Sequence, residues 1–183
     1  MATQWNNQVT EKEFEFPQLI DPLTVNLVKL LRLEINKPFW FSKHRHPGGD
    51  ARPWNDGNHY SLHYTGIDHE NSAIQKRAIP NNKFLCRALD FSVDCYDPVD
   101  FLNIATAIDH ILVDVSPASG FGIYPNWNHP GFHVDTRKGH HPSAGARWYT
   151  IKVDDRQEYQ TIQPGSFYSS LLNIEDEFNQ WHS

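Results

Sequence analysis

The stretch GIYPNWNHPGFHVDTR, Gly122 to Arg137, combines aromatic side chains with side chains that bind metals or move protons. Its last part, GFHVDTR, is expected to form a short strand. Because side chains alternate in direction along a strand, His133 and Asp135 would then point to the same face. An imidazole and a carboxylate on one face can address one metal ion, or the carboxylate can hold the imidazole. A half-buried strand with a solvated polar side explains the same pattern.

Two groups of residues upstream could complete such a site. The segment NHYSLHYTG contains His59 and His63, and Ser61, His63 and Gly66 form the pattern Ser-x-His-x-x-Gly. Further along, RALDF places Asp90 between apolar neighbours. Burying an unpaired carboxylate is costly, and a metal ion or another cation would remove that cost. The alternative is that Asp90 lies on the solvent-exposed face of an edge strand.

The elements that would position these residues are indicated by caps and periodicity. Asp21–Pro22 and Asp97–Pro98 each place a side-chain acceptor before a proline, which is typical of a helix start. Apolar residues at three-and-four spacing follow and predict helices over 22–33 and 98–115. The tail SFYSSLLNIEDEFNQWH predicts a terminal helix. Short strands are expected in PFWFSKHR, CRALDFSVDCY, GFGIYP, GFHVDTR and ARWYTIKV. This order predicts an α+β fold, with a small antiparallel sheet flanked by helices.

The composition fits a single domain over residues 1–183. The chain is 39% hydrophobic and has a formal net charge of -6. Without a basic face, nucleic acid and anionic membranes are not expected as partners. No run of 18 apolar residues is present, so membrane insertion is not expected. The N-terminus lacks the basic-then-apolar order of a secretory signal. Cys86 and Cys95 make no disulfide framework, and the sequence leaves their pairing open.

Taken together, these motifs resemble the M15 zinc peptidases. That family contains D-alanyl-D-alanine carboxypeptidases, related peptidoglycan endopeptidases and phage endolysins, and it shares a fold with the hedgehog signalling domain. The resemblance covers roughly residues 38–150. It rests on Ser-x-His-x-x-Gly at 61–66, Arg-Ala-x-Asp-Phe at 87–91, and a Tyr-Pro turn, Phe-His-Val-Asp and Arg-Trp within 122–148. It implies a hedgehog/DD-peptidase-like fold.

The resemblance implies a Zn²⁺ ion held by His63, Asp90 and His133. Three nitrogen and oxygen ligands leave a fourth position of zinc for water, as in catalytic sites. That water becomes a nucleophile near neutral pH, and the ion polarises the scissile carbonyl. Arg45, in FWFSKHR, would bind a substrate carbonyl or carboxylate through its planar fork, unless it forms a surface salt bridge. The remaining substrate-binding candidates are Ser61, Tyr124, Arg147 and Trp148, and packing is the alternative role for the aromatic ones.

The sequence departs from the family pattern between the first two ligands. The family keeps its His and Asp seven positions apart, whereas a polar segment at about 67–86 separates the two motifs here. We interpret this segment as an insertion, since loop closure costs little per added residue. A register without an insertion would put Lys83 in the histidine position. Because a charged lysine cannot replace a zinc-bound imidazole, that register would mean a catalytically inactive site.

The second departure concerns the general base. Many family members place an acidic residue three positions before the last ligand, where this chain has Pro130. His129 is then the first candidate for the base, ahead of Asp135, and His140 also lies nearby. Asp135 could instead orient His133 or a substrate amine, as residues behind metal ligands commonly do.

These patterns predict a zinc-dependent peptidase that hydrolyses peptidoglycan stem peptides or cross-links. Without a signal peptide, a phage-type lytic enzyme is expected, made in the cytoplasm and released to the cell wall with a holin, or carried in the virion. The alternative is a catalytically inactive virion structural or cell-wall-binding module on the same fold. The insertion and the missing acidic base favour that alternative. A third interpretation, an iron oxygenase, follows from the spacing of His133 and Asp135 with a distant histidine.

Overall fold

The fold is taken from a computed structural model, which describes residues 13, 20–41, 52–53, 64–65, 86–137, 139, 141 and 143–182. For 52–53 and 64–65 only the backbone is described. Arg45, Ser61 and His63 lie outside these residues, as does the expected insertion up to residue 85. The elements are α1 (Pro22–Ile35), β1 (Phe39–Phe41), β2 (Arg52–Pro53), β3 (Tyr64–Thr65), β4 (Ala88–Val93), α2 (Pro98–Val115), β5 (Phe121–Tyr124), β6 (Gly131–Asp135), β7 (Arg147–Val153), β8 (Arg156–Ile162) and α3 (Phe167–His182).

The first two helices begin where the Asp-Pro pairs predict. The Asp21 carboxylate accepts a hydrogen bond from the Leu23 backbone N–H at 2.8 Å. The Asp97 carboxylate accepts one from the Asp100 N–H at 2.9 Å. Each bond satisfies a backbone donor that has no partner inside the helix. The expected helix over 22–33 extends to Ile35, where Asn36 follows in the left-handed conformation (φ 53°) and ends it.

The strands form a six-stranded sheet in the order β1-β4-β6-β5-β7-β8, with β2 and β3 paired separately. The sheet is mixed. Strands β5 and β7 run parallel, and the other neighbours in the sheet are antiparallel. The α+β class is therefore confirmed, but the expectation of a small antiparallel sheet is wrong, since the sheet has six strands and one parallel pair. The parallel pair requires a long connection, and residues 125–146, which include β6, supply it.

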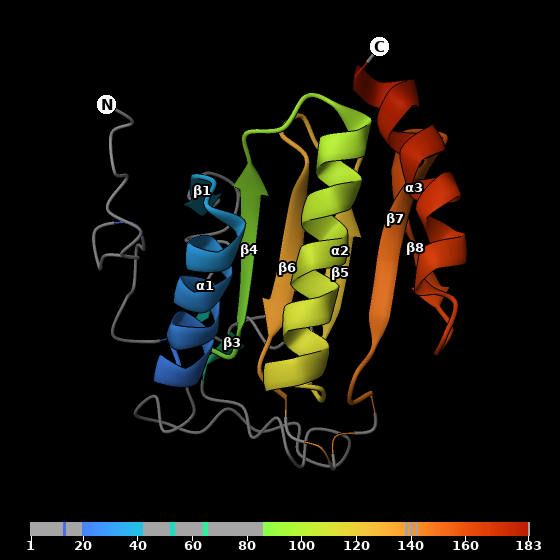
Figure 1. The fold of residues 1–183 in the computed structure, drawn as a ribbon. Coiled ribbons are helices and arrows are strands. Elements are labelled where there is room, and N and C mark those ends of the chain that lie inside the picture. The colour runs from blue at the N-terminus through green and yellow to red at the C-terminus, as the bar shows by residue number, and fades with distance from the viewer. Residues whose placement is uncertain are drawn as a thin grey trace, which may run out of the picture.

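The two faces of the sheet differ in character. All three helices lie over one face (Figure 1). On that face Phe132 of β6 stacks against Phe101 of α2, with ring centroids 4.9 Å apart, and Phe101 contacts Phe178 of α3 at 5.1 Å. The apolar residues of β4, β5 and β6 that alternate with the site residues belong to this core. Consecutive side chains in a strand point to opposite faces, so His133 lies on the face away from the helices.

Two expectations from the composition can be compared with the structure. In the part of the chain that the structure describes, none of the helices has the length and apolar character needed to span a bilayer. Cys86 and Cys95 are both buried, lie beyond opposite ends of β4, and do not form a disulfide with each other. Burial raises the pKa of the Cys95 thiol to about 11, which keeps this thiol protonated at neutral pH.

Candidate functional site

The pairing of β4 with β6 brings Asp90 and His133 together across 43 residues of sequence. The two residues are direct partners in the antiparallel ladder, so their side chains share one face. The Nδ1 atom of His133 lies 2.8 Å from Oδ1 of Asp90. Both side chains are largely buried, at 8% and 15% exposed. Two of the three metal ligands expected from the sequence are therefore neighbours in the structure.

The other ring nitrogen of His133 faces Asp135, two residues along the same strand. The distance from His133 Nε2 to Asp135 Oδ2 is 3.2 Å. The Asp135 carboxylate is fully buried, and Arg137 forms a two-pronged ion pair with it, with Nε donating to Oδ1 at 2.7 Å. The backbone N–H of Gly120 also donates to Oδ1, at 2.9 Å. Asp90, His133, Asp135 and Arg137 thus form a continuous chain of charged groups.

This chain shifts the protonation of its members. Burial alone would lower the pKa of His133, but hydrogen bonds to Asp135 and Asp90, with their charges, outweigh it and raise the pKa to about 9. Burial alone would raise the pKa of Asp135, but the bonds from Arg137 and His133 hold it well below its usual range. Asp135 is therefore a weak base, and both of its oxygens already accept hydrogen bonds. Of its two expected roles, the geometry favours orienting His133 over accepting a proton from water.

Trp148 of β7 lies against the other side of the imidazole. Its ring centroid is 5.1 Å from that of His133, and the Arg137 guanidinium carbon lies 6.0 Å from the indole ring. The indole crosses Gly122 of β5, where an added Cβ would lie 2.5 Å from the ring. The glycine is thus required for this close approach.

A second aromatic pair borders the site at the far end of β5. Tyr124 stacks on Trp127, with ring centroids 4.1 Å apart and an interplanar angle of 4°. The Trp127 ring covers Gly131, where an added Cβ would lie 3.0 Å from it. Burial raises the pKa of the Tyr124 phenol well above its usual range, and the charge of Asp90 adds to this shift. The phenol therefore stays neutral and remains a hydrogen-bond donor.

His129 lies near the same strand but is not part of the chain of charged groups. Its residue is exposed, and its backbone carbonyl accepts a hydrogen bond from the Ser92 hydroxyl at 3.1 Å. Ser92 lies two residues from Asp90 on β4 and therefore on the same face. This contact places the backbone of His129, in the turn before β6, next to Ser92 of β4.

Arg147 is placed on the opposite face of the sheet from His133. It is the ladder partner of Phe121, a core residue under the helices. Its Nε donates to Asp109 of α2 at 2.5 Å, and its Nη1 donates to the Ser119 carbonyl at 2.6 Å. These contacts join α2 to the loop before β5. The structure does not bring Arg147 together with the other predicted site residues.

No known family, curated protein or solved structure matches this chain.

The donor set fits a zinc site in part. Two ligands of a tetrahedral zinc with bonds of about 2.0–2.1 Å lie roughly 3.3 Å apart. The nearest atoms of Asp90 and His133 are 2.8 Å apart, so a small separation would admit the ion. Behind the imidazole, Asp135 occupies the position of the carboxylate that metal-binding histidines usually contact. Among the residues that the structure describes, no group of three or more His, Cys, Asp or Glu side chains is arranged to hold a metal. The third expected ligand, His63, is outside them.

The iron-oxygenase interpretation needs both His133 and Asp135 to ligate one ion. Both oxygens of Asp135 accept hydrogen bonds from Arg137 or Gly120, and its Oδ2 also contacts His133 Nε2. The two side chains therefore contact each other and do not point together toward one position that a metal ion could occupy. This arrangement disfavours a His-x-Asp ligand pair.

Sequence reasoning missed the residues that support the site. Arg137 continues the period-two series of His133 and Asp135, and this alternation is the signal that it shares their face. The close approach at Gly122 had a weaker signal, because a glycine within a short strand indicates a nearby backbone, side chain or ligand without saying which.

Proposed function

We propose that this protein is a zinc-dependent peptidase of the M15 type that hydrolyses stem peptides or cross-links of peptidoglycan. The observation that carries the proposal is the contact between Asp90 and His133. A carboxylate and an imidazole from distant segments meet on the polar face of the sheet, at 2.8 Å, with a second carboxylate behind the ring. This contact supports Asp90 and His133 as two zinc ligands, with Asp135 as a group that orients the ring.

Asp90 and His133 would hold the zinc together with His63, and Asp135 would keep the His133 ring in place. When bound, zinc would supply a Lewis acid for the scissile carbonyl and lower the pKa of a bound water. The chain's own groups would do the rest. His129, in the turn before β6, is the candidate to accept the proton of that water. Tyr124, as a neutral phenol, can donate a hydrogen bond to a peptide oxygen, and Trp148 excludes water from the imidazole.

Arg45 and Ser61 would bind substrate, as the sequence resemblance implies. The biological setting that the resemblance implies is a phage-type lytic enzyme that reaches the wall through a holin or in the virion. Because Asp90 and His133 lie on the face of the sheet opposite to the helices, substrate would approach from that face.

One observation favours a second candidate function. Both nitrogens of His133 already contact carboxylates, so the chain from Asp90 to Arg137 can persist as a closed ionic network without any metal. In that case the fold would serve as a virion structural or cell-wall-binding module without catalysis.

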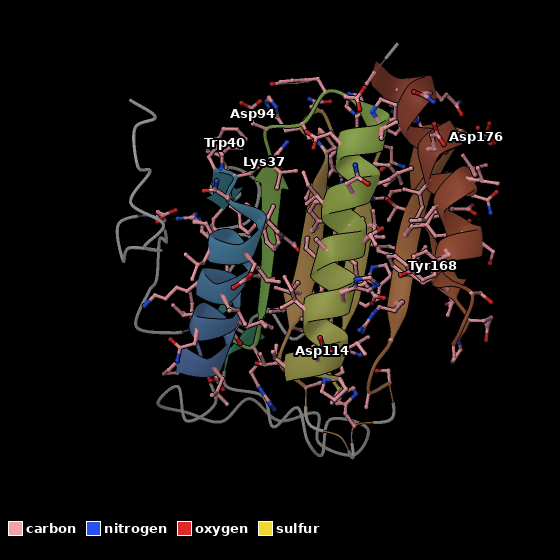
Figure 2. The ribbon with its side chains drawn as sticks, in the orientation of Figure 1. Lys37, Trp40, Asp94, Asp114, Tyr168 and Asp176 are labelled. Carbon is pink, nitrogen blue, oxygen red and sulfur yellow. The ribbon has the colours of Figure 1, made fainter. Side chains whose placement is uncertain are left out.

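Metal content and wall digestion distinguish the two functions. Purified protein is treated with zinc, dialysed and subjected to elemental analysis, and then incubated with purified cell wall and synthetic stem peptides. We expect about one zinc per chain, lost in Asp90→Ala, His133→Ala and His63→Ala, and release of D-alanine or cleaved stem peptide. Asp94→Ala, just beyond the end of β4 (Figure 2), and His110→Ala on α2 are the matched controls and should keep both. Zinc-loaded protein that leaves wall and peptides untouched across neutral pH would contradict the peptidase.

A further inference from the structure

Arg137 ends the chain of charged groups and uses its whole guanidinium there. Its side chain is 9% exposed. Its Nε donates to Asp135 Oδ1 at 2.7 Å, and its Nη2 contacts Asp135 Oδ2. Its Nη1 donates to the backbone carbonyl and the hydroxyl of Ser143, at 2.9 and 2.6 Å. A planar fork held on both sides fixes the orientation of the carboxylate that it grips.

Asp135 has no freedom left to turn. Each of its oxygens faces two groups: Oδ1 accepts from Gly120 N–H and Arg137 Nε, while Oδ2 meets Arg137 Nη2 and His133 Nε2. The carboxylate also lies directly above Gly120, where an added Cβ would be 2.3 Å from Oδ2. The position of Oδ2 is therefore set by Arg137 and by the backbone of the loop before β5.

The fixed Asp135 carboxylate holds the imidazole of His133 in an orientation with Nε2 toward Asp135. His133 Nε2 lies 3.2 Å from the buried Asp135, whereas Nδ1 lies 2.8 Å from Asp90, whose side chain is 15% exposed. A metal-binding histidine uses one nitrogen for the metal and donates its other N–H to an acceptor. Because Asp135 is the immobile acceptor, its partner Nε2 would be the nitrogen that keeps a hydrogen when a metal is bound.

We propose that Arg137 is a positioning residue which, through Asp135, holds the Nε2–H of His133 and so presents Nδ1 to the metal. This inference rests on the proposed zinc site and deepens it, because it assigns the ligating nitrogen and a residue that controls it. Arg137 does not touch the metal or the substrate in this arrangement. Its effect is to keep one ring nitrogen occupied.

The test uses full-length protein labelled with nitrogen-15 in histidine and loaded with cadmium-113 in place of zinc. Coupling between cadmium and a ring nitrogen reports which nitrogen of His133 is bound. We expect coupling to Nδ1 alone and a slowly exchanging proton on Nε2. Coupling to Nε2 would overturn the inference.

Variants separate positioning from general stability. We expect Arg137→Gln to weaken cadmium and zinc binding by about 10- to 100-fold, as loss of a partner behind a metal ligand typically does, and to remove the slow Nε2–H signal. Arg137→Lys keeps the charge but not the fork, so it should fall between wild type and Arg137→Gln. It also serves if Arg137→Gln does not fold. Metal affinity equal to that of wild type in both variants would overturn the inference.

A matched control is Arg32→Gln. Arg32 is also a buried arginine, paired with Glu13 and bonded to the Phe39 carbonyl, but it belongs to α1. It should lose stability while keeping metal affinity and the ring signals. If wild-type protein binds no cadmium yet shows an Nε2–H signal that depends on Arg137, the zinc site fails while the positioning of the ring stands. If that signal is present in Arg137→Gln, the positioning itself fails.

Discussion

His133 is the side chain in which the charges of the site meet. It lies between Asp90 and Asp135, and the two carboxylates raise its pKa to about 9 against the effect of burial. A histidine buried with this pKa binds a proton more tightly in the folded chain than in the unfolded one. The charge state of the ring is therefore coupled to folding.

The stability of the metal-free protein should fall as pH rises past neutrality. The contribution of His133 is fully present below the unfolded pKa of about 6.5 and is lost as pH rises through about 9. A shift of this size corresponds to roughly 3 kcal/mol. Urea unfolding in the presence of a chelator at pH 6 and pH 9 measures the difference. His133→Gln is the comparison, since it has no proton to lose there, and equal pH dependence in both proteins would show that the ring is not held by its carboxylates.

Part of this residue-level arrangement could be predicted from the sequence. Period-two alternation placed His133 and Asp135 on one face, and the structure agrees. The contact with Asp90 followed from the family resemblance, because no local pattern relates residues 43 positions apart. The alternation also extends to Arg137, but whether it meets solvent or Asp135 depends on the loop that carries Ser143.

At the scale of elements, a glycine in β5 leaves room for the indole of Trp148 to lie across the strand. Its Gly122 lies beneath the indole of Trp148, which in turn lies against His133. An alanine Cβ at this position would lie 2.5 Å from indole atoms, well inside van der Waals contact. The ring would have to move away from the imidazole or the strand would have to shift.

Gly122→Ala should therefore destabilise the protein by about 1–3 kcal/mol, the usual cost of overpacking. Gly139→Ala is the control, because an added Cβ there meets nothing within 4 Å, and it should change stability by less than about 0.5 kcal/mol. Urea unfolding measures both. Equal stabilities of the two variants would mean that Trp148 does not cover β5 as described.

The elements differ in how well the sequence specified them. The helices α1 and α2 carry a capping carboxylate followed by proline, so their starts were predictable. Strand β8 was missed because it is an exposed edge strand, RQEYQTI, with almost no apolar alternation. The tight turn before β8 is formed by Asp154 and Asp155, both at positive φ (48° and 61°). Asn-Gly at these positions would have been a stronger sequence signal for a hairpin. The parallel pairing of β5 with β7 had no local signal at all.

At the scale of the whole molecule, all three helices lie over one face of the sheet (Figure 1). The site residues alternate with the core residues of β4 and β6 and therefore lie on the other face. Glu177 of α3 connects this helix to β7 and to the turn that follows β5. Its Oε1 accepts hydrogen bonds from the Lys152 backbone N–H on β7 at 2.7 Å, from Asn126 at 2.9 Å and from Trp181 at 3.0 Å. Asn126 belongs to the turn between Tyr124 and His129, so α3 supports the turn that borders the site.

Replacing Glu177 by alanine should cost about 2–4 kcal/mol, because it leaves three donors without their acceptor. Asp176→Ala on the same helix (Figure 2) is exposed and should change stability by less than about 0.5 kcal/mol. Denaturant unfolding followed by tryptophan fluorescence measures both. A Glu177→Ala protein as stable as Asp176→Ala would show that α3 is held by its apolar face alone.

The central claim is that Asp90 and His133 are ligands of one zinc ion on the polar face of the sheet. Its most direct test is an anomalous difference map at the zinc edge, from crystals of zinc-treated protein. We predict one strong peak about 2.0–2.2 Å from an Asp90 oxygen and from Nδ1 of His133. A map without that peak, in which Asp90 and His133 still hydrogen-bond directly to each other, would contradict it.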